Sequence, residues 1–232
     1  MQKKFIVICA AIILSLAVFS CGPKGDSGAA GPTGLPGAGC LVVNFQEGVY
    51  PDSSYAGCVD GRLREDAAAL NYGTSTTLQL GVSALNARKR GNFKFDISDE
   101  LTGVVVEDAY LTVYAAAIYS GSPVFALYEF TTGWVETQAT WNVYSTGNLW
   151  TAAGGDFNAA AISDSVNINA VGYHTFRINA SVVQKWIDDE TSNKGIMMKI
   201  TDESVIGDLL IAVSENTTGS FRPRLTVYYT AP

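Results

Sequence analysis

The chain has 232 residues, 47% of them hydrophobic, so it can bury a sizeable core. Its formal net charge is −7, from 15 basic and 22 acidic residues. Because binding to nucleic-acid phosphates requires clustered Lys and Arg, this acidic balance excludes a nucleic-acid-binding protein.

The N-terminal segment, residues 1–20, has the parts of a secretory signal peptide. Two lysines precede an apolar run over residues 5–19, which is shorter than the roughly 20 residues of a membrane-spanning helix. Residues 18–21, Val-Phe-Ser-Cys, resemble the lipobox of bacterial lipoproteins. That resemblance implies export, lipidation of Cys21 and a membrane anchor, and Gly22 favours the outer membrane or cell surface. The alternative is ordinary signal-peptidase cleavage and a soluble secreted protein.

The segment that follows repeats with a period of three. Residues 22–39 form six uninterrupted Gly-X-Y triplets. Only Gly fits at the axis of a collagen triple helix, so this period is typical of collagen-like chains. Residues 21–39 are therefore predicted to form a lipidated, extended collagen-like stalk that tethers the domain. A homotrimer through residues 22–39 is left open, because six triplets are short for a stable triple helix. The alternative is a flexible Gly-rich spacer.

Two cysteines remain beyond Cys21 in the mature chain. Cys40 and Cys58 lie 18 positions apart. In an oxidising compartment such a pair predicts one disulfide, and two free thiols are the alternative.

From residue 40 onward, short β-rich runs alternate with turn signals. The predicted strands are Leu41–Gln46, Arg62–Glu65, Thr77–Val82, Asn92–Ile97, Ala109–Ala116, Val124–Phe130, Val166–Ile168, Tyr173–Ile178, Gly195–Ile200, Leu209–Val213 and Arg224–Tyr229. Many short strands without intervening helices predict an all-β domain over residues 40–232, an antiparallel, jelly-roll-like β-sandwich. One short helix is predicted after Asn179, with a stripe of Val182, Val183, Trp186 and Ile187 that plugs one end of the sandwich.

Several short motifs, taken together and in order, carry a family resemblance. They are Phe45–Gly48, Asp60–Glu65, Asn71–Gly73, Leu78–Val82, Arg90–Ser98, Ala139–Asn142, Gly154–Phe157, Val183–Trp186, Asn193–Gly195 and Arg222–Leu225. In this order they resemble the DNRLRE-domain family, a jelly-roll-like group related to disaggregatase-type and carbohydrate-binding modules. Gly61 stands where the name motif has Asn. The resemblance covers about residues 43–229 and implies a noncatalytic exported module of surface or polysaccharide-degrading proteins.

Signatures of catalysis are absent from the sequence. It contains no Gly-x-Ser-x-Gly elbow, no His-Glu-x-x-His motif and no phosphate-binding loop. The single histidine, His174, lies in a predicted strand and is interpreted as structural. The chain is therefore predicted not to be an enzyme, to have no catalytic residues and to need no organic cofactor.

Basic and aromatic side chains provide the ligand-binding hypothesis. Arg62 and Arg64 share one strand face, and Arg90 and Lys94 share a face of another strand. These faces could bind a polysaccharide with carboxylated sugars, because guanidinium groups fit carboxylates. The alternative is pairing with neighbouring acids in a surface charge lattice. Trp150, in a predicted loop, is the candidate for stacking on a sugar ring.

A structural calcium ion is a further hypothesis, based on acids near predicted strand ends. These acids are Glu47, Asp60, Asp156 and Asp202. As a whole, the sequence predicts a lipid-anchored, surface-displayed, noncatalytic module that binds polysaccharide. The alternatives are a structural or adhesive surface protein with an oligomerising stalk and, behind it, a polysaccharide lyase or hydrolase.

Overall fold

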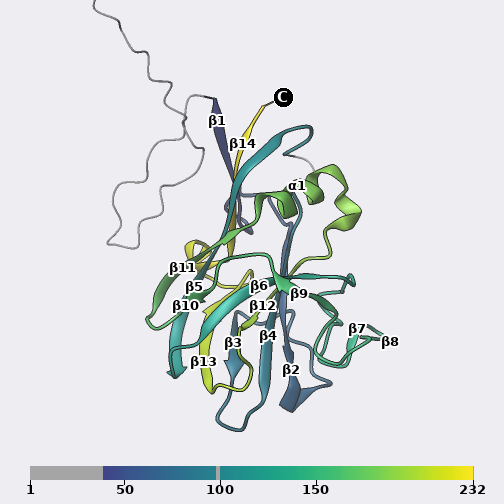
Figure 1. Ribbon diagram of the computed structural model, residues 1–232, viewed down its shortest axis with the longest axis vertical. Helices are drawn as coiled ribbons and strands as arrows, with labels where there is room; N and C mark the ends of the chain where they lie inside the picture. Colours follow the sequence, from purple (N-terminus) through teal and green to yellow (C-terminus); the bar gives the residue numbers. More distant parts are fainter. Residues whose placement is uncertain (1–38, 98–99, 232) are drawn as a thin grey trace, which may run out of the picture.

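The computed structural model describes residues 39–97 and 100–231 (Figure 1). The predicted signal peptide, Cys21 and the Gly-X-Y stalk lie outside the described residues. The strands are β1 (Cys40–Phe45), β2 (Cys58–Arg64), β3 (Thr77–Val82), β4 (Arg88–Phe95), β5 (Val105–Ser120), β6 (Val124–Phe130), β7 (Val143–Ser145), β8 (Asn148–Leu149), β9 (Phe157–Ala161), β10 (Val166–Asn167), β11 (Gly172–Ile178), β12 (Ile196–Ile200), β13 (Gly207–Ala212) and β14 (Arg224–Thr230). The helices are α1 (Ala180–Asp188) and the 3-10 turns η1 (Glu65–Ala67), η2 (Glu190–Ser192) and η3 (Gly219–Phe221).

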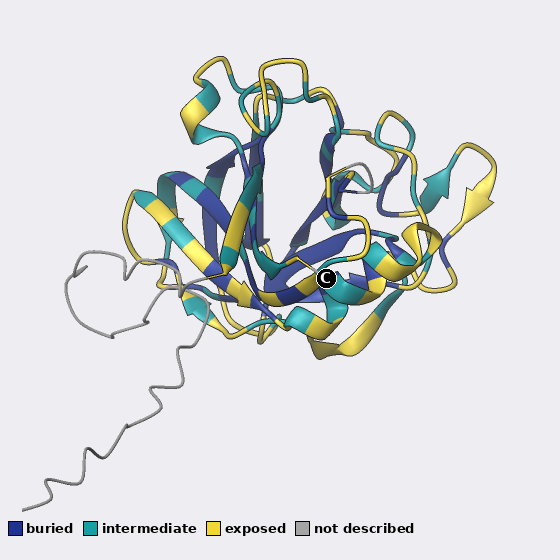
Figure 2. Cartoon of the chain, turned by 90° about the horizontal axis from the view of Figure 1, so that it is seen from above, coloured by how far each residue is buried: buried dark blue, intermediate teal, exposed yellow. Residues whose placement is uncertain are grey.

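Twelve of these strands form one antiparallel sheet, and β7 and β8 form a separate hairpin. The strand order is β1-β14-β5-β13-β3-β4-β12-β6-β10, with β11 added to β5, β2 to β4 and β9 to β6. The sheet curls, so that its two halves face each other around a buried interior (Figure 2). The prediction of an all-β antiparallel sandwich is thereby confirmed.

The longest strand, β5, joins the parts of the curled sheet. It has 16 residues, and Ala109, Leu111, Val113 and Ala115 of its central part point into the core at every second position. It pairs with β14 over residues 105–112, with β11 over 109–115 and with β13 over 115–120. All the strands predicted from the sequence are found, whereas β7, β8 and β9 were not predicted.

Hydrophobic side chains form two clusters, one on each face of the β2-β4-β12-β6 half. The larger cluster fills the space inside the curled sheet and includes Phe93, Phe125 and Ile196. The smaller cluster lies on the outer face, where residues 131–156, here named the cover segment, pack against the sheet. It contains Leu63, Ala126, Tyr128, Phe130, Ala139, Trp141, Trp150 and Met197. This half of the sheet is therefore buried on both faces.

The helix α1 closes one end of the sandwich, as predicted. Val183 and Trp186 are buried in the main core. Asn179 occupies the N-cap position, but its side chain makes no capping hydrogen bond. Gln184 instead fixes the helix to β5, because its Oε1 accepts a hydrogen bond of 2.8 Å from Val106 N. No described helix is long and apolar enough to cross a membrane.

The disulfide predicted between Cys40 and Cys58 is not formed. Cys58 is a free thiol and is buried. The two cysteines begin strands with different partners, since Cys40 lies opposite Thr230 of β14 and Cys58 opposite Phe95 of β4. Their separation of 18 positions in the sequence does not show that they lie in strands with different partners. The prediction is therefore wrong, and Cys58 serves as a small core side chain.

Cys58 should resist alkylation in the native protein and react once the protein is unfolded. Burial raises the pKa of the Cys58 thiol, so the native state offers neither access nor thiolate. The protein is labelled with iodoacetamide in buffer and in guanidinium chloride, both without reductant. Peptide mass spectrometry then shows in which sample Cys58 is labelled. A peptide linking Cys58 to Cys40 in the unreduced digest would contradict it.

Candidate functional site

The pairing of β2 with β4 decides where the predicted basic residues point. Arg62 lies opposite Gly91, and Leu63 lies opposite Arg90. Because side chains alternate between the two faces of a strand, Arg62 and Arg64 share the face of Phe93, which points into the sandwich. Arg90 and Lys94 lie on the outer face. The two basic faces predicted from the sequence thus point to opposite sides of the sheet.

The inner pair is already bound within the protein. Arg62 is only 8% exposed, and its guanidinium lies 3.9 Å from the ring centroid of Tyr72. Arg64 forms a two-point ion pair with Asp66, in which Nη2 lies 2.8 Å from Oδ2. Arg64 therefore follows the alternative interpretation, in which the basic residues pair with neighbouring acids. Neither Arg62 nor Arg64 presents a free guanidinium to a ligand.

Arg90, on the outer face, is also satisfied internally. It binds Glu203 through two hydrogen bonds of 2.7 Å, from Nε and Nη2. Its Nη1 donates to Gly154 O at 2.8 Å, and its guanidinium lies 5.0 Å from the ring centroid of Trp141. Gly154 has φ +92° and approaches so closely that a Cβ would lie 2.8 Å from Arg90 Nη1. Arg90 therefore fastens the cover segment to the sheet.

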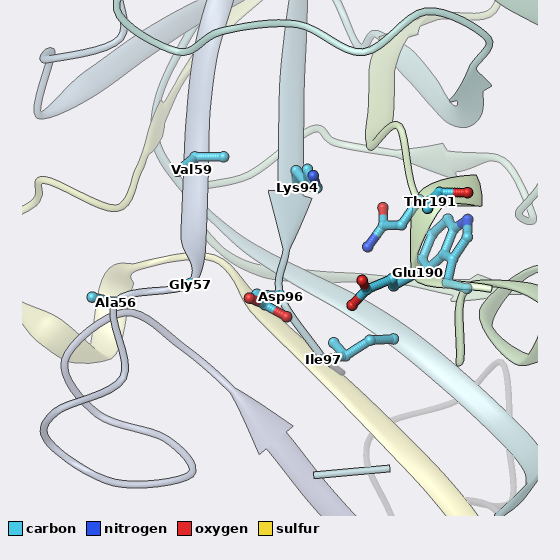
Figure 3. A pocket seen from close by; sticks show the side chains of 10 residues that line it. Ala56, Gly57, Val59, Lys94, Asp96, Ile97, Glu190 and Thr191 are labelled. Carbon is cyan, nitrogen blue, oxygen red and sulfur yellow. The ribbon is translucent and has the colours of Figure 1, made fainter. Parts of the chain in front are cut away.

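Lys94 is the predicted binding residue that stays free. It is half-buried, and it forms no ion pair with any other residue among 39–97 and 100–231. It lines two neighbouring pockets of about 420 and 240 Å³, which share Glu190, Thr191 and Asn193. Figure 3 shows Lys94, Asp96 and Glu190 around the larger pocket. The two pockets, with a third of about 350 Å³ that shares Ala56, Gly57, Asp96 and Ile97, are here named the groove.

One end of the groove combines aromatic rings with positive charge. Trp134 and Tyr144 line it together with Lys94 and Lys194. Lys194 forms no ion pair with another described residue either. The indole Nε1 of Trp134 is enclosed and has no hydrogen-bond partner. Two free ammonium groups beside two rings suit a ligand that has both apolar faces and negative charge.

The other end of the groove is acidic. Asp52, Asp96 and Glu100 line it next to Tyr55 and Pro51. The Tyr55 hydroxyl donates to the carbonyl of Asp96 at 2.9 Å, and burial is the main cause that raises the pKa of this hydroxyl. Neutral Tyr55 and the carboxylates offer hydrogen bonds to hydroxyl groups, so this end suits an uncharged polar ligand.

Trp150 does not have the exposed position that the sequence suggested. It is 5% exposed, its Nε1 donates to Thr140 O at 2.8 Å, and its ring stacks against Phe130. The loop that contains it folds back onto the sheet and becomes part of the second core. The half-buried Trp134 lines the groove instead.

The acids proposed for calcium are used in separate local contacts. Asp156 accepts backbone hydrogen bonds from Thr151 and Ala152, and Asp202 accepts from Ser204. Glu47 accepts from Cys58 N, and Asp60 is fully buried with a pKa raised by its burial. Across the described part of the chain, no group of three or more His, Cys, Asp or Glu side chains is placed to hold a metal ion.

Comparison with known families decides what kind of module this is. The chain matches the model of carbohydrate-binding module family 96 over residues 59–228. It belongs to carbohydrate-binding module family 96. Among curated proteins, none matches the chain.

The family 96 match runs from β2 into β14, so it contains both lysines and both rings of the positive end of the groove. The predicted likeness to carbohydrate-binding modules is confirmed, and the narrower DNRLRE assignment stays a prediction. Sequence reasoning missed Lys194, Glu190 and Thr191 as site residues. The available signal was the Asn193–Gly195 motif, which was used for the family resemblance but not for a site.

Replacing Arg90 by Ala should lower the free energy of unfolding by about 3 kcal/mol. The largely buried carboxylate of Glu203 would lose its two-point partner and keep only the longer contact of 3.9 Å with Lys199. The matched control is Arg64→Ala, which breaks a pair whose side chains are each 30% exposed and should cost less than about 1 kcal/mol. Guanidinium chloride unfolding of both variants measures the difference. Equal losses of unfolding free energy in the two variants would show that Arg90 does not fasten the cover segment to the sheet.

Proposed function

We propose that this family 96 module is noncatalytic and binds a polysaccharide along the groove. The observation that carries the proposal is Lys94, a free cation set between the aromatic and the acidic parts of the groove. Open pockets that join end to end suit a chain-like ligand better than a small molecule, which is usually enclosed on most sides.

The polysaccharide is proposed to be anionic, with a carboxylated sugar at the positive end. Lys94 and Lys194 supply positive charge that no described carboxylate pairs with, in a chain whose net charge is −7. Trp134 and Tyr144 supply ring faces for the apolar side of the same sugar. The acidic end would then accept hydrogen bonds from the hydroxyl groups of sugars without carboxylates.

Absence of catalysis follows the character of the family, because carbohydrate-binding modules are typically noncatalytic. In the groove, Asp96 and Glu190 are exposed carboxylates. Glycoside hydrolysis uses a pair of carboxyl groups set on either side of the scissile bond in a cleft, whereas these two carboxylates lie on the open wall of the groove and suit hydrogen bonds to sugar hydroxyl groups.

The module is further proposed to be displayed on the cell surface. The support lies in the sequence before the described residues: the signal-peptide pattern of residues 1–20, the lipobox-like Cys21 and the Gly-X-Y triplets of 22–39. β1 begins at Cys40, directly after the last triplet, so the domain of residues 40–232 would sit at the end of a stalk. A homotrimer through the stalk belongs to this proposal and to its structural alternative alike.

Lys94→Gln should weaken binding to polygalacturonate about tenfold, or by about 1.4 kcal/mol, because one of two free cations is lost while most of the side-chain volume is kept. Binding of the unchanged protein should also weaken as salt rises, because exposed charges are screened beyond about 8 Å at physiological ionic strength. Isothermal titration calorimetry at low and high salt measures both effects.

The control variant is Arg64→Gln, on the inner face and paired with Asp66, which should bind as the unchanged protein does. Loss of binding in Arg64→Gln with full binding in Lys94→Gln would place the ligand elsewhere. Release of unsaturated or shortened sugars from the polymer during the titration would show that the module is catalytic.

Cys21→Ser should move the protein from the membrane fraction to the soluble fraction, because the serine hydroxyl cannot carry the thioether-linked lipid. Fractionation of cells that express the two forms, followed by immunoblotting, checks this outcome. Membrane association that persists in Cys21→Ser would contradict lipid anchoring at this residue.

A further inference from the structure

A second surface lies on the outer face of the β1-β14-β5-β11 half of the sheet. In β5 the core residues Ala109, Leu111 and Val113 alternate with Tyr110, Thr112 and Tyr114, which point away from the core. The register places Tyr173 of β11 beside Tyr114, and Thr226 of β14 beside Tyr110. Since the core lies between the two halves, this face and the outer face that bears Lys94 point away from each other.

Aromatic rings gather on this outward face in two groups. Tyr114 stacks on Phe221, with ring centroids 3.9 Å apart and an interplanar angle of 7°, and Tyr173 lies edge-on to Tyr114 at 5.0 Å. Tyr110 and Tyr228 form the second group at 6.0 Å. The five rings are here named the tyrosine face. Tyr173 is 54% exposed and the other rings are half-buried, so none is part of the core.

Polar groups lie between the two groups of rings. Thr112 and Thr175 are joined by a hydroxyl–hydroxyl contact of 3.0 Å, and Thr226 donates to Asn44 at 2.7 Å. Arg224 lies opposite Thr112, and it forms no hydrogen bond or ion pair with another described residue. Its Nε is enclosed, so the terminal nitrogens of the guanidinium are the groups that can donate to an incoming ligand.

The Tyr110 end of this face carries one ion pair and further acids. Arg177, opposite Tyr110, binds Asp108 at 2.8 Å, and the Tyr110 hydroxyl donates to the same carboxylate. Beyond this pair, the surface continues into a pocket of about 400 Å³, which two further acids, Glu107 and Asp164, also line. Rings and hydroxyl groups complement a ligand that offers apolar ring faces and many hydroxyl groups. The acids at the Tyr110 end disfavour an anionic polymer, so a ligand without net charge suits this face best.

We propose that the tyrosine face is a second carbohydrate-binding surface, and that its ligand is a chain of uncharged sugars. Sugar rings stack on the Tyr114, Tyr173 and Phe221 group and on the Tyr110 and Tyr228 group, and Arg224 and the threonines bind the hydroxyl groups between them. The inference shares with the proposed function only the carbohydrate ligand of the family. It concerns another face and another sugar chemistry, so that the protein would hold two polysaccharides at once.

The test uses the mature chain and a panel of soluble neutral polysaccharides: mixed-linkage β-glucan, xyloglucan and galactomannan. Affinity gel electrophoresis at low and high salt should show retardation by at least one polymer, unchanged by salt, since stacking is not screened. The double variant Tyr173→Ala with Tyr228→Ala should lose at least tenfold in affinity. Tyr173→Phe with Tyr228→Phe keeps the rings and should bind as the unchanged protein does.

The two proposals fail separately in this design. Lys94→Gln should leave retardation by the neutral polymer intact, while the alanine double variant should keep its affinity for polygalacturonate, which also shows that it is folded. No retardation by any neutral polymer, or equal retardation of the alanine double variant, would overturn the tyrosine face. Loss of neutral binding in Lys94→Gln would overturn it too, because one groove would then bind both ligands.

Discussion

The site depends on the alternation of side chains along β4. Phe93 and Phe95 must enter the main core, and this requirement fixes Arg90 and Lys94 on the opposite face of the same strand. The antiparallel register then fixes β2, so that Arg62 and Arg64 take the inner face. A shift by one residue would exchange these faces and bury Lys94 in the core. The burial of two phenylalanines therefore determines which cations a ligand can reach.

The cover segment divides the outer face into a closed part and an open part. Over the closed part, Arg90 binds Gly154, and Gly155 lies so close to Met197 that a Cβ would be 2.6 Å from its Cε. Lys94 comes four residues after Arg90 on the same face, where Trp134 and the η2 turn border the pockets. The same strand thus supplies the arginine that holds the cover in place and the lysine at the edge of the cover. Rigid support of this kind positions a binding side chain better than a loop does.

The sequence could predict the strands because hydrophobic alternation is a local property. β3 and β6 match their predicted bounds, and the stripe of Val183 and Trp186 identified α1. β9 was missed because Phe157–Ala161 contains three alanines and has no alternation. The partners of the charged residues could not be predicted, since they depend on tertiary contacts: Arg90 and Glu203 are 113 positions apart. For the same reason, the cysteines could not be assigned from their spacing, and Trp150 could not be recognised as buried.

The net charge of the chain is a poor guide to the charge of its individual surfaces. Several arginines pair with acids within the fold, as in the Arg64–Asp66, Arg90–Glu203 and Arg177–Asp108 pairs. These pairs remove positive charge from the surface without changing the total of −7. At short range, a polymer would meet the charges that are not paired within the fold. These are the free lysines at the end of the groove and the unpaired Arg224 beside the rings of the tyrosine face. Screening limits the field of the whole chain to about 8 Å at physiological ionic strength, so the unpaired local charge, and not the net charge, selects the ligand.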